Sequence, residues 1–353
     1  MWYNTRVTEM LGIQYPILQG PFGGNLSTVR LASTVSNLGG LGGFGAYTMN
    51  PEEILALDRD LKQATDKPYN INLWVSDMDA GKADLQKVRD LFKPYFEELG
   101  VPLPEGPFSF ESRFENQVDV LLHAKPAVFS FVFGIPSQTI LDQCRKLGIV
   151  TAGGATTLDE AIALEHAGVD VIVASGFEGG GHRPSFLASA ETSLTGTFVL
   201  VQQIKEKVRT PVVAAGGIAT GRGIAAALAL GADGVQVGTA FLACDESNAP
   251  ETHREILFSD RSRYSVLTRA FTGRLGRGLQ NRISEEVKGE VLPFPLQTRF
   301  MAPLRQAAIA QNKWDMVLLW GGQIAPVLKH RKTKDLMEAL VKETTDYFST
   351  FGK

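Results

Sequence analysis

Short apolar segments alternate with longer amphipathic segments along most of this chain, and this alternation restricts the folds that it can adopt. Eight of the apolar segments have the length and the small or β-branched residues of buried strands. They span residues 16–20, 41–44, 69–74, 127–132, 149–152, 169–174, 211–215 and 233–237. Strands that are apolar on both faces are typical of parallel sheets, so the pattern predicts an α/β fold.

The intervals between these segments show the periodicity of helices. Helical patterns cover residues 27–38, 51–64, 137–147, 157–166, 196–208, 221–230 and 328–347. Asn50 and Pro51 form a favourable N-cap and first turn, and Thr157 with Glu160 matches a capping box. A strand-and-helix unit that recurs eight times without a strong antiparallel signal favours a (β/α)₈ TIM barrel over an open doubly wound sheet.

Two regions depart from this rhythm. The gap at about 76–125 is roughly twice a normal crossover and contains a charged helical pattern at 82–99, so we expect an insertion there. The segment 243–304 is polar and basic and shows no strand-and-helix unit. We therefore predict a barrel formed by 1–242 and 305–353, with 243–304 as a smaller lid or cap domain.

Charge and cysteine content narrow the class of partner. A formal net charge of -3 gives no electrostatic reason to expect nucleic acid or an anionic membrane, so a small molecule is the expected ligand. Two cysteines are too few for a disulfide framework, which suggests a reducing compartment. With no secretory signal and no apolar run of the roughly 18 residues that span a bilayer, we expect a cytoplasmic protein. Cys144 is expected to pack inside a helix, whereas Cys244 follows the last strand and could act as a nucleophile.

Glycine loops follow three of the later strands. In barrels, ligands bind where the strands end, and phosphate groups commonly sit on the loops after the seventh and eighth strands. The 216–217 glycine pair and the Gly-Thr pair at 238–239 occupy those two loops, and a helix that begins at 221–223 adds backbone donors nearby. Each loop taken alone could simply form a tight turn. Together with the triple glycine at 179–181, they favour a bound phosphate cofactor.

One histidine stands directly after the triple glycine. His182 would be a titratable group held over the ligand, although a hydrogen-bonded loop histidine without catalytic function fits the same pattern. The other histidines are less informative. His166 lies at a helix end, and His123, His253 and His330 are expected at the surface. No pair has metal-ligand spacing, so we expect no metal site.

Amide side chains occur where the barrel would open. Asn70 and Asn72 are two residues apart on the third predicted strand, so both should point to the same face. An amide there can pair with the edge of a heterocycle, or it can be a polar residue inside the barrel. Gln19 and the 21–24 turn place another amide and exposed backbone after the first strand.

These segments resemble the nitronate monooxygenase family, formerly called 2-nitropropane dioxygenases, which are FMN-dependent barrels. The matching pieces are PILQGPFGG (16–24), INLWV (71–75), GFEGGGHR (176–183), the block at 211–242, TRAFTGRLGRGLQNR (268–282) and WGGQ (320–323). They follow the family's order over nearly the full chain. The block at 211–242 is long and specific, and the histidine loop at 176–183 is the most specific of the short segments.

The resemblance implies FMN as cofactor and His182 as the catalytic residue. It implies that Asn72 and Gly180 contact the flavin ring, and that Gly217 and residues 236–239 hold the phosphate end. The full set of implied cofactor-binding residues is Gln19, Pro21, Phe22, Gly23, Asn72, Ser175, Gly180, Gly181, Gly216, Gly217, Gln236, Val237, Gly238 and Thr239.

Three positions depart from the family pattern. Ser175 stands where members commonly carry glutamine, so one flavin contact differs. Gly179 replaces the usual alanine and Pro184 the usual glycine, which stiffens the loop after His182 and could shape a different substrate pocket.

The implied reaction is the oxidation of an alkyl nitronate, such as propionate 3-nitronate, by O₂ to a carbonyl compound and nitrite. We expect His182 to orient the anionic nitronate by a charge-assisted hydrogen bond, whereas a neutral nitroalkane would need it as a general base. The same barrel also serves FMN-dependent NAD(P)H oxidoreductases of the quinone reductase or enoyl-ACP reductase type. A phosphate-ligand barrel without flavin and a non-catalytic FMN-binding protein are further alternatives. The chain could also assemble as a homo-oligomer.

Overall fold

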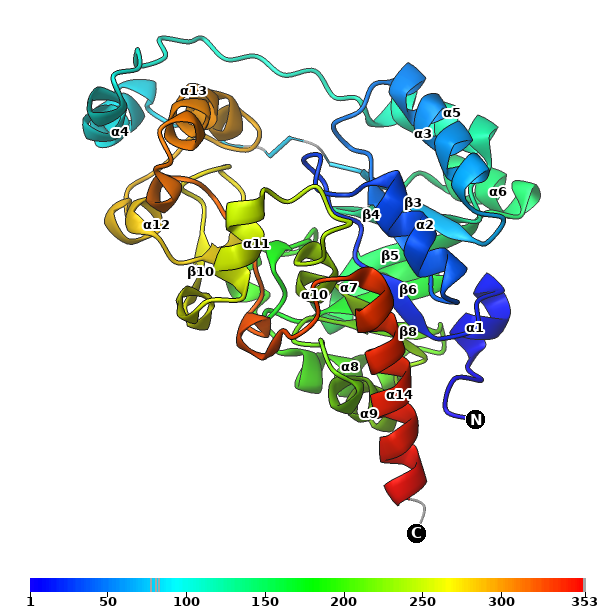
Figure 1. Ribbon diagram of the computed structural model, residues 1–353. Helices are drawn as coiled ribbons and strands as arrows, with labels where there is room; N and C mark the ends of the chain where they lie inside the picture. Colours follow the sequence, from blue (N-terminus) through cyan, green and yellow to red (C-terminus); the bar gives the residue numbers. More distant parts are fainter. Residues whose placement is uncertain (77, 80, 82, 352–353) are drawn as a thin grey trace.

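Eight parallel strands form the centre of the molecule (Figure 1). The structure, a computed structural model, describes residues 1–76, 78–79, 81 and 83–351. The strands are β1 (Ile17–Gln19), β2 (Gly42–Gly45), β3 (Tyr69–Trp74), β4 (Val128–Val132), β5 (Val150–Ala155), β6 (Val171–Ser175), β8 (Val212–Ala215) and β9 (Gly234–Val237). Their order is β1-β9-β8-β6-β5-β4-β3-β2, and a bridge between Leu18 and Leu41 joins the two ends of the sheet. The predicted TIM barrel is therefore confirmed.

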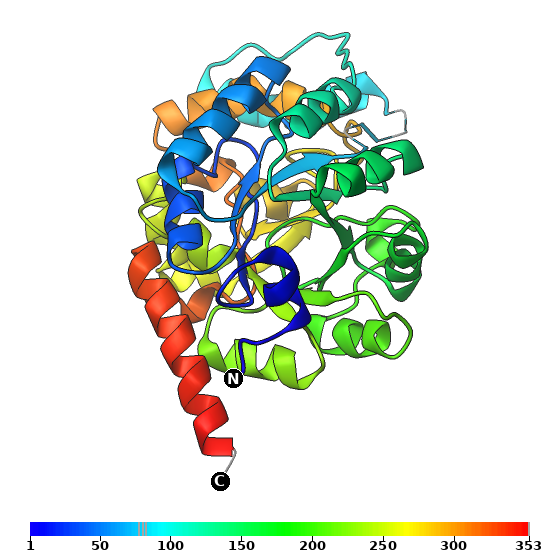
Figure 2. The ribbon, with the colours of Figure 1, turned by 90° about the vertical axis from the view of Figure 1, so that its right-hand side faces the viewer.

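Helices surround the strands. They are α2 (Val29–Asn37), α3 (Pro51–Ala64), α5 (Phe114–Ala124), α6 (Gln138–Leu147), α7 (Leu158–His166), α8 (Thr197–Lys205), α9 (Gly221–Ala229) and α14 (Thr333–Phe351). Helix α14 packs on α9 and α2 and completes the wall. Helix α1 (Arg6–Leu11) packs Val7 and Leu11 against strand residues of the barrel interior, and this dark blue helix lies across one end of the barrel in Figure 2. No helix in the described part of the chain is long and apolar enough to cross a membrane.

The start of α7 differs from its prediction. Thr157 accepts a hydrogen bond from the backbone of Glu160, as an N-cap should. The carboxylate of Glu160, however, accepts hydrogen bonds from the N–H groups of Thr156 and Phe186, both at 2.6 Å. The predicted capping box is therefore wrong, and the buried Glu160 instead anchors the loop that follows His182.

The long gap between β3 and β4 contains two helices with different partners. Helix α5 packs on α3 and β3 and is the barrel's own crossover helix. Helix α4 (Leu85–Leu99) packs instead on α13 (Leu296–Ala310), and Figure 1 shows the two side by side at the edge of the molecule. Residues 77, 80 and 82, which belong to the predicted insertion, lie outside the described residues.

A second apolar core lies beside the barrel. It is built around Phe92, Phe96 and Phe300 and extends from α4 to residue 325. Its elements include α10 (Thr239–Leu242), α11 (Glu251–Leu257), α12 (Arg282–Glu286) and an antiparallel sheet of β10 (Ser265–Thr268), β11 (Gly276–Leu279) and β7 (Gly181–His182). We propose that the smaller domain comprises α4 and residues 243–327, because position 304 lies inside α13.

Candidate active site

A cavity of about 380 Å³ lies where the barrel strands end and the smaller domain begins. This volume is in the range of small-ligand sites. It is lined by thirteen of the fifteen residues expected from the sequence, namely Pro21, Phe22, Gly23, Asn72, Ser175, Gly180, Gly181, His182, Gly216, Gly217, Gln236, Gly238 and Thr239. Gln19 and Val237 do not line it. The Gln19 amide is buried and accepts a hydrogen bond from Gly43 N–H at 2.8 Å, and Val237 packs in the core.

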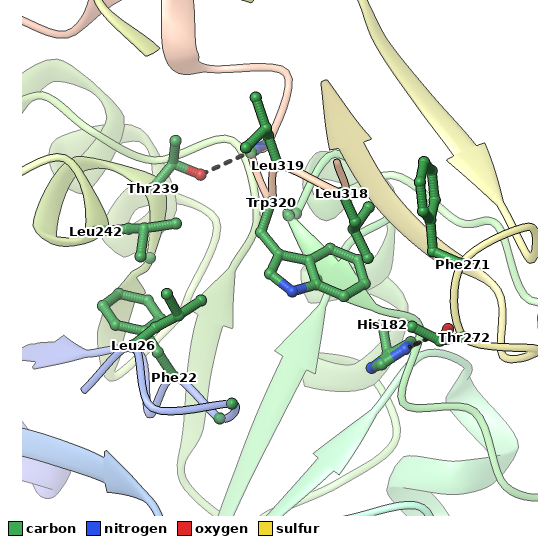
Figure 3. A pocket seen from close by; sticks show the side chains of 18 of the residues that line it. Phe22, Leu26, His182, Thr239, Leu242, Phe271, Thr272, Leu318, Leu319 and Trp320 are labelled. Carbon is green, nitrogen blue, oxygen red and sulfur yellow. Dashed lines mark hydrogen bonds between the residues drawn. The ribbon is translucent and has the colours of Figure 1, made fainter. Parts of the chain in front are cut away.

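The His182 ring stands in a box of aromatic side chains. Its centroid lies 4.8 Å from Trp320, 5.4 Å from Trp74, 5.7 Å from Phe294 and 6.4 Å from Phe133. Two strands fix this position, because β7 carries His182 and pairs with β11 of the smaller domain. Figure 3 shows the ring between Trp320 and Thr272. These rings cover part of the imidazole, and the His182 side chain is half-buried at the cavity.

The charge state of His182 follows from this environment. Burial and, to a smaller extent, the nearby cations Arg274 and Arg269 lower its pKa to about 3. Arg274 is held over the Phe133 ring at 3.9 Å and forms an ion pair with Asp79. The imidazole is therefore neutral at physiological pH.

The loops after β8 and β9 border the cavity with backbone rather than side chains. Gly216 and Gly217 have φ values of +105° and +70°, which favour glycine. A Cβ atom added at Gly238 would meet nothing within 4 Å, so this backbone faces open space. Residues 221–223 at the start of α9, which were predicted to add donors, do not line the cavity: Gly221 N–H donates to the Glu343 carboxylate at 2.8 Å and Gly223 N–H to the Thr220 hydroxyl at 3.2 Å.

The two asparagines of β3 point to the same face, as predicted. The side-chain amides of Asn70 and Asn72 both donate to the hydroxyl of Ser130, at 2.8 Å and 2.9 Å. Asn72 lines the cavity, whereas Asn70 lies deeper in the barrel. The Asn72 backbone carbonyl accepts a hydrogen bond from Ala46 N–H at 2.9 Å, but among the described residues no donor reaches the side-chain oxygen Oδ1. It can therefore accept a hydrogen bond from a ligand.

A segment from the end of the smaller domain completes the cavity. A Cβ atom at Gly180 would come within 2.7 Å of the Gly322 nitrogen, so the two glycines allow the histidine loop to pack on this segment. The Gly322 N–H donates to the Thr239 hydroxyl at 2.9 Å, and Gln323 N–H donates to the Glu178 carbonyl at 3.0 Å. Sequence reasoning singled out this segment only through its resemblance to WGGQ.

Arg183 sets the shape of the loop after β6. Its guanidinium is buried and donates to the backbone carbonyls of Gly176, Ser175 and Ser193 at 2.7 to 3.1 Å. Burial lowers its pKa to about 10, so it remains a cation. This role was missed because its partners are backbone atoms, which leave no pattern in the sequence.

Two expectations about single residues are wrong. His253 was expected at the surface, but it is buried, lines the cavity and bonds to the Trp320 carbonyl at 2.8 Å. Its spacing from Ile256 and Leu257, which are also buried, could have indicated an inward-facing residue. Cys244 does not line the cavity, and burial raises the pKa of its thiol to about 12, so it is not placed to act as a nucleophile.

The smaller domain also contributes charge at the cavity. Arg305 of α13 lines it at a solvent-exposed position, where no described carboxylate forms an ion pair with its side chain. Tyr47 lines the opposite, barrel side and stacks on Trp74 with ring centroids 3.6 Å apart. Burial raises the Tyr47 pKa to about 12, although Arg274 and Arg305 oppose this shift. Neither Tyr47 nor Arg305 was predicted from the sequence.

Comparisons with known proteins give a consistent result. A family model described as nitronate monooxygenase matches residues 4–343. The chain is 36% identical over 348 residues to a probable nitronate monooxygenase of Staphylococcus aureus (strain Newman), covering 97% of this chain and 98% of that protein. It is 37% identical over 349 residues to a probable nitronate monooxygenase of Staphylococcus haemolyticus (strain JCSC1435), covering 97% and 98%.

Two solved structures extend the comparison. The structure of nitroalkane oxidase from Streptomyces ansochromogenes has a TM-score of 0.91 and 32% identity, covering 98% of this chain and 99% of that one. The structure of FabK from Thermotoga maritima has a TM-score of 0.76 and 28% identity, covering 99% and 98%.

Proposed function

We propose that this chain, which belongs to the nitronate monooxygenase family, oxidises alkyl nitronates with O₂ in the cavity described above. In the overall reaction, two nitronate anions and one O₂ give two carbonyl compounds and two nitrite ions. The observation that carries the proposal is the position of His182, whose neutral ring lines the cavity inside an aromatic box. A neutral imidazole flanked by aromatic side chains suits a small anionic substrate.

We further propose FMN as the cofactor, because the lining residues fit its parts. The backbone at Gly238 faces open space and leaves room for a phosphate group, which N–H groups would hold. The side-chain oxygen Oδ1 of Asn72 would accept a hydrogen bond from the ring. Bound FMN would supply the electron transfer between nitronate and O₂. The proposed cofactor-holding residues are Pro21, Phe22, Gly23, Asn72, Ser175, Gly180, Gly181, Gly216, Gly217, Gln236, Gly238 and Thr239.

The charges around His182 define its proposed role. Arg274 and Arg269, which are ion-paired with Asp79 and Glu191, disfavour the imidazolium. A bound nitronate adds the opposite charge and so raises the His182 pKa. We therefore expect nitronate binding to be coupled to proton uptake at His182, which produces the charge-assisted hydrogen bond that orients the substrate. A neutral nitroalkane would instead give its Cα proton to the imidazole.

Arg305 supports a more specific substrate. The exposed Arg305 guanidinium, which no described carboxylate pairs with, can bind a carboxylate at the far end of a substrate, and Tyr47 offers a hydroxyl nearby. Propionate 3-nitronate carries such a carboxylate beside its nitronate group. We therefore propose carboxylate-bearing nitronates as preferred substrates over simple alkyl nitronates.

Product analysis tests the proposed function. The purified protein, reconstituted with FMN, is incubated aerobically with ethyl nitronate or propionate 3-nitronate, and nitrite, carbonyl product and O₂ consumption are measured. We expect nitrite and carbonyl product in equal amounts, and about half as much O₂ consumed if peroxide is absent, by the stoichiometry above. Absence of nitrite, together with NAD(P)H oxidation in the presence of a quinone or an enoyl thioester, would instead favour the NAD(P)H oxidoreductase alternative.

A further inference from the structure

The hydroxyl of Thr272 sits between His182 and the backbone of Arg274. His182 Nε2 lies 2.8 Å from Thr272 Oγ1, and this contact is drawn as a dashed line in Figure 3. The same hydroxyl donates to the carbonyl of Arg274 at 3.1 Å and accepts from its N–H at 3.3 Å. Thr272 is itself nearly buried, with 9% of its surface exposed. The hydroxyl proton therefore has two competing acceptors, the imidazole nitrogen and the carbonyl oxygen.

Counting protons decides between them. A carbonyl oxygen can only accept a hydrogen bond. In the described part of the chain, the Arg274 carbonyl accepts its hydrogen bond from the Thr272 hydroxyl. If the hydroxyl donated to His182 instead, this buried carbonyl would lose its donor, at a cost of roughly 1–3 kcal/mol. The hydroxyl proton therefore goes to Arg274, and Nε2 of His182 must carry a hydrogen and donate to Oγ1. Nδ1 then holds the lone pair.

The free nitrogen faces the cavity. Nδ1 has no hydrogen bond within the described part of the chain, and in Figure 3 the second ring nitrogen points away from Thr272 toward the open side of the pocket. We infer that Thr272 is a positioning residue that fixes the tautomer and orientation of His182, so that Nδ1 presents its lone pair to the substrate. The structural part of this inference is independent of the proposed function; its effect on turnover rests on that function.

Neighbouring charges do not supply the same constraint. Arg274 and Arg269, in the segment that also carries Thr272, are cations without acceptor atoms, and Arg274 is engaged with Asp79. The side chains packed on the ring from the barrel and the smaller domain are aromatic, and Tyr47 lies behind Trp74. Among the described residues, Thr272 is therefore the neutral side chain that hydrogen-bonds to the imidazole ring of His182.

Histidine ¹⁵N NMR tests the inference without any turnover. Selective labelling of the 5 histidines gives two ring-nitrogen shifts for each, and the spectrum of His182→Asn identifies those of His182. In the wild-type protein at neutral pH, we expect one protonated nitrogen at Nε2 and one unprotonated nitrogen at Nδ1. In Thr272→Val, the Nε2–H would face a methyl group, so the population should move toward the Nδ1–H form by about tenfold. Thr272→Ser should keep the wild-type pattern.

Kinetics with a nitronate provide the second readout. In Thr272→Val, protonation of His182 would leave an N–H against a methyl group, so kcat/KM should fall about tenfold or more, whereas Thr272→Ser should recover most of it. Thr272→Ala gives the same comparison if the valine variant does not fold. Thr192→Val, which removes a hydroxyl bonded only within the exposed 189–192 turn, is the matched control.

The outcomes separate the two claims. Wild-type spectra with the Nδ1–H tautomer, or spectra unchanged in Thr272→Val and Thr272→Ala, would overturn the positioning role. The expected spectra with no nitronate turnover in any variant would leave the positioning role supported and remove the proposed function.

Discussion

Nε2 of His253 lies 2.8 Å from the carbonyl oxygen of Trp320, and the Trp320 indole packs against the His182 ring with centroids 4.8 Å apart. His253 of the smaller domain thus hydrogen-bonds to the backbone of Trp320, the aromatic residue that packs on His182. Because the carbonyl can only accept, His253 must be neutral with its hydrogen on Nε2 or be fully protonated. Burial lowers its pKa to about 4, so the neutral form is present at neutral pH.

His253→Leu should lower both stability and turnover. It leaves the Trp320 carbonyl without this donor and should reduce the free energy of unfolding by roughly 1–3 kcal/mol. His253→Gln, whose amide can still donate, is the control and should lose less.

The lowered pKa of His253 also predicts a pH effect. In the unfolded state His253 takes up a proton below about pH 6.5, whereas in the folded state it does so only below about pH 4. The stability of the wild-type protein should therefore fall as the pH drops across this window. Denaturant titrations should show a shallower fall in both variants; an equally steep fall would contradict the assignment.

Gly238→Ala should weaken FMN binding without disturbing the protein. Its methyl group would enter open space at the proposed phosphate end, so the Kd for FMN should rise about tenfold or more while the melting temperature of the apoprotein changes little. Gly180→Ala is the contrasting variant, because its methyl group would come within 2.7 Å of the Gly322 nitrogen. That variant should lower the melting temperature as well. Unaltered FMN affinity in Gly238→Ala, measured by flavin fluorescence, would argue against this phosphate position.

Arg305→Ala should change substrate preference. If the guanidinium pairs with a substrate carboxylate, kcat/KM for propionate 3-nitronate should fall about tenfold or more, while that for ethyl nitronate stays within about twofold. Arg305→Lys retains the charge and should fall less. Equal losses of kcat/KM with both substrates would show that Arg305 does not bind the substrate carboxylate.

His182→Asn should separate chemistry from cofactor binding. Asparagine fills similar space but cannot take up a proton, so we expect kcat/KM for nitronates to fall about a hundredfold or more. FMN content after purification should remain close to that of the wild-type protein. Parallel losses of flavin and activity would assign His182 to cofactor binding instead.

Much of the barrel could be predicted because its signals are local. Each strand is a short apolar run and each crossover helix has its own periodicity, so all eight barrel strands and the clustering of their loops followed from the alternation. The two-residue strand β7 could not be predicted, since its pairing with β11 depends on residues almost a hundred positions away. The hydrogen bond between His182 and Thr272 could not be predicted for the same reason, because the two residues are far apart in the sequence. The polarity of His253 predicts a surface position, whereas its helical spacing from the buried Ile256 and Leu257 matches the inward position that it has.

The predicted gap between β3 and β4 illustrates a different limit. Its excess length was visible in the sequence, but which part belongs to the barrel depends on packing. Phe114 and Val118 of α5 belong to the main core, whereas Phe92 and Phe96 of α4 belong to the second one. Both helices are amphipathic, so their sequences alone do not identify their partners.

Anaerobic reduction of the bound flavin tests the central claim most directly. The FMN-loaded protein is mixed without O₂ with ethyl nitronate in one experiment and with NADH or NADPH in another, and the flavin absorbance is followed by stopped flow. We predict rapid loss of the oxidised-flavin absorbance with the nitronate and little change with either nicotinamide. Rapid reduction by NADH or NADPH with no response to nitronate would contradict the proposed function and favour the NAD(P)H oxidoreductase.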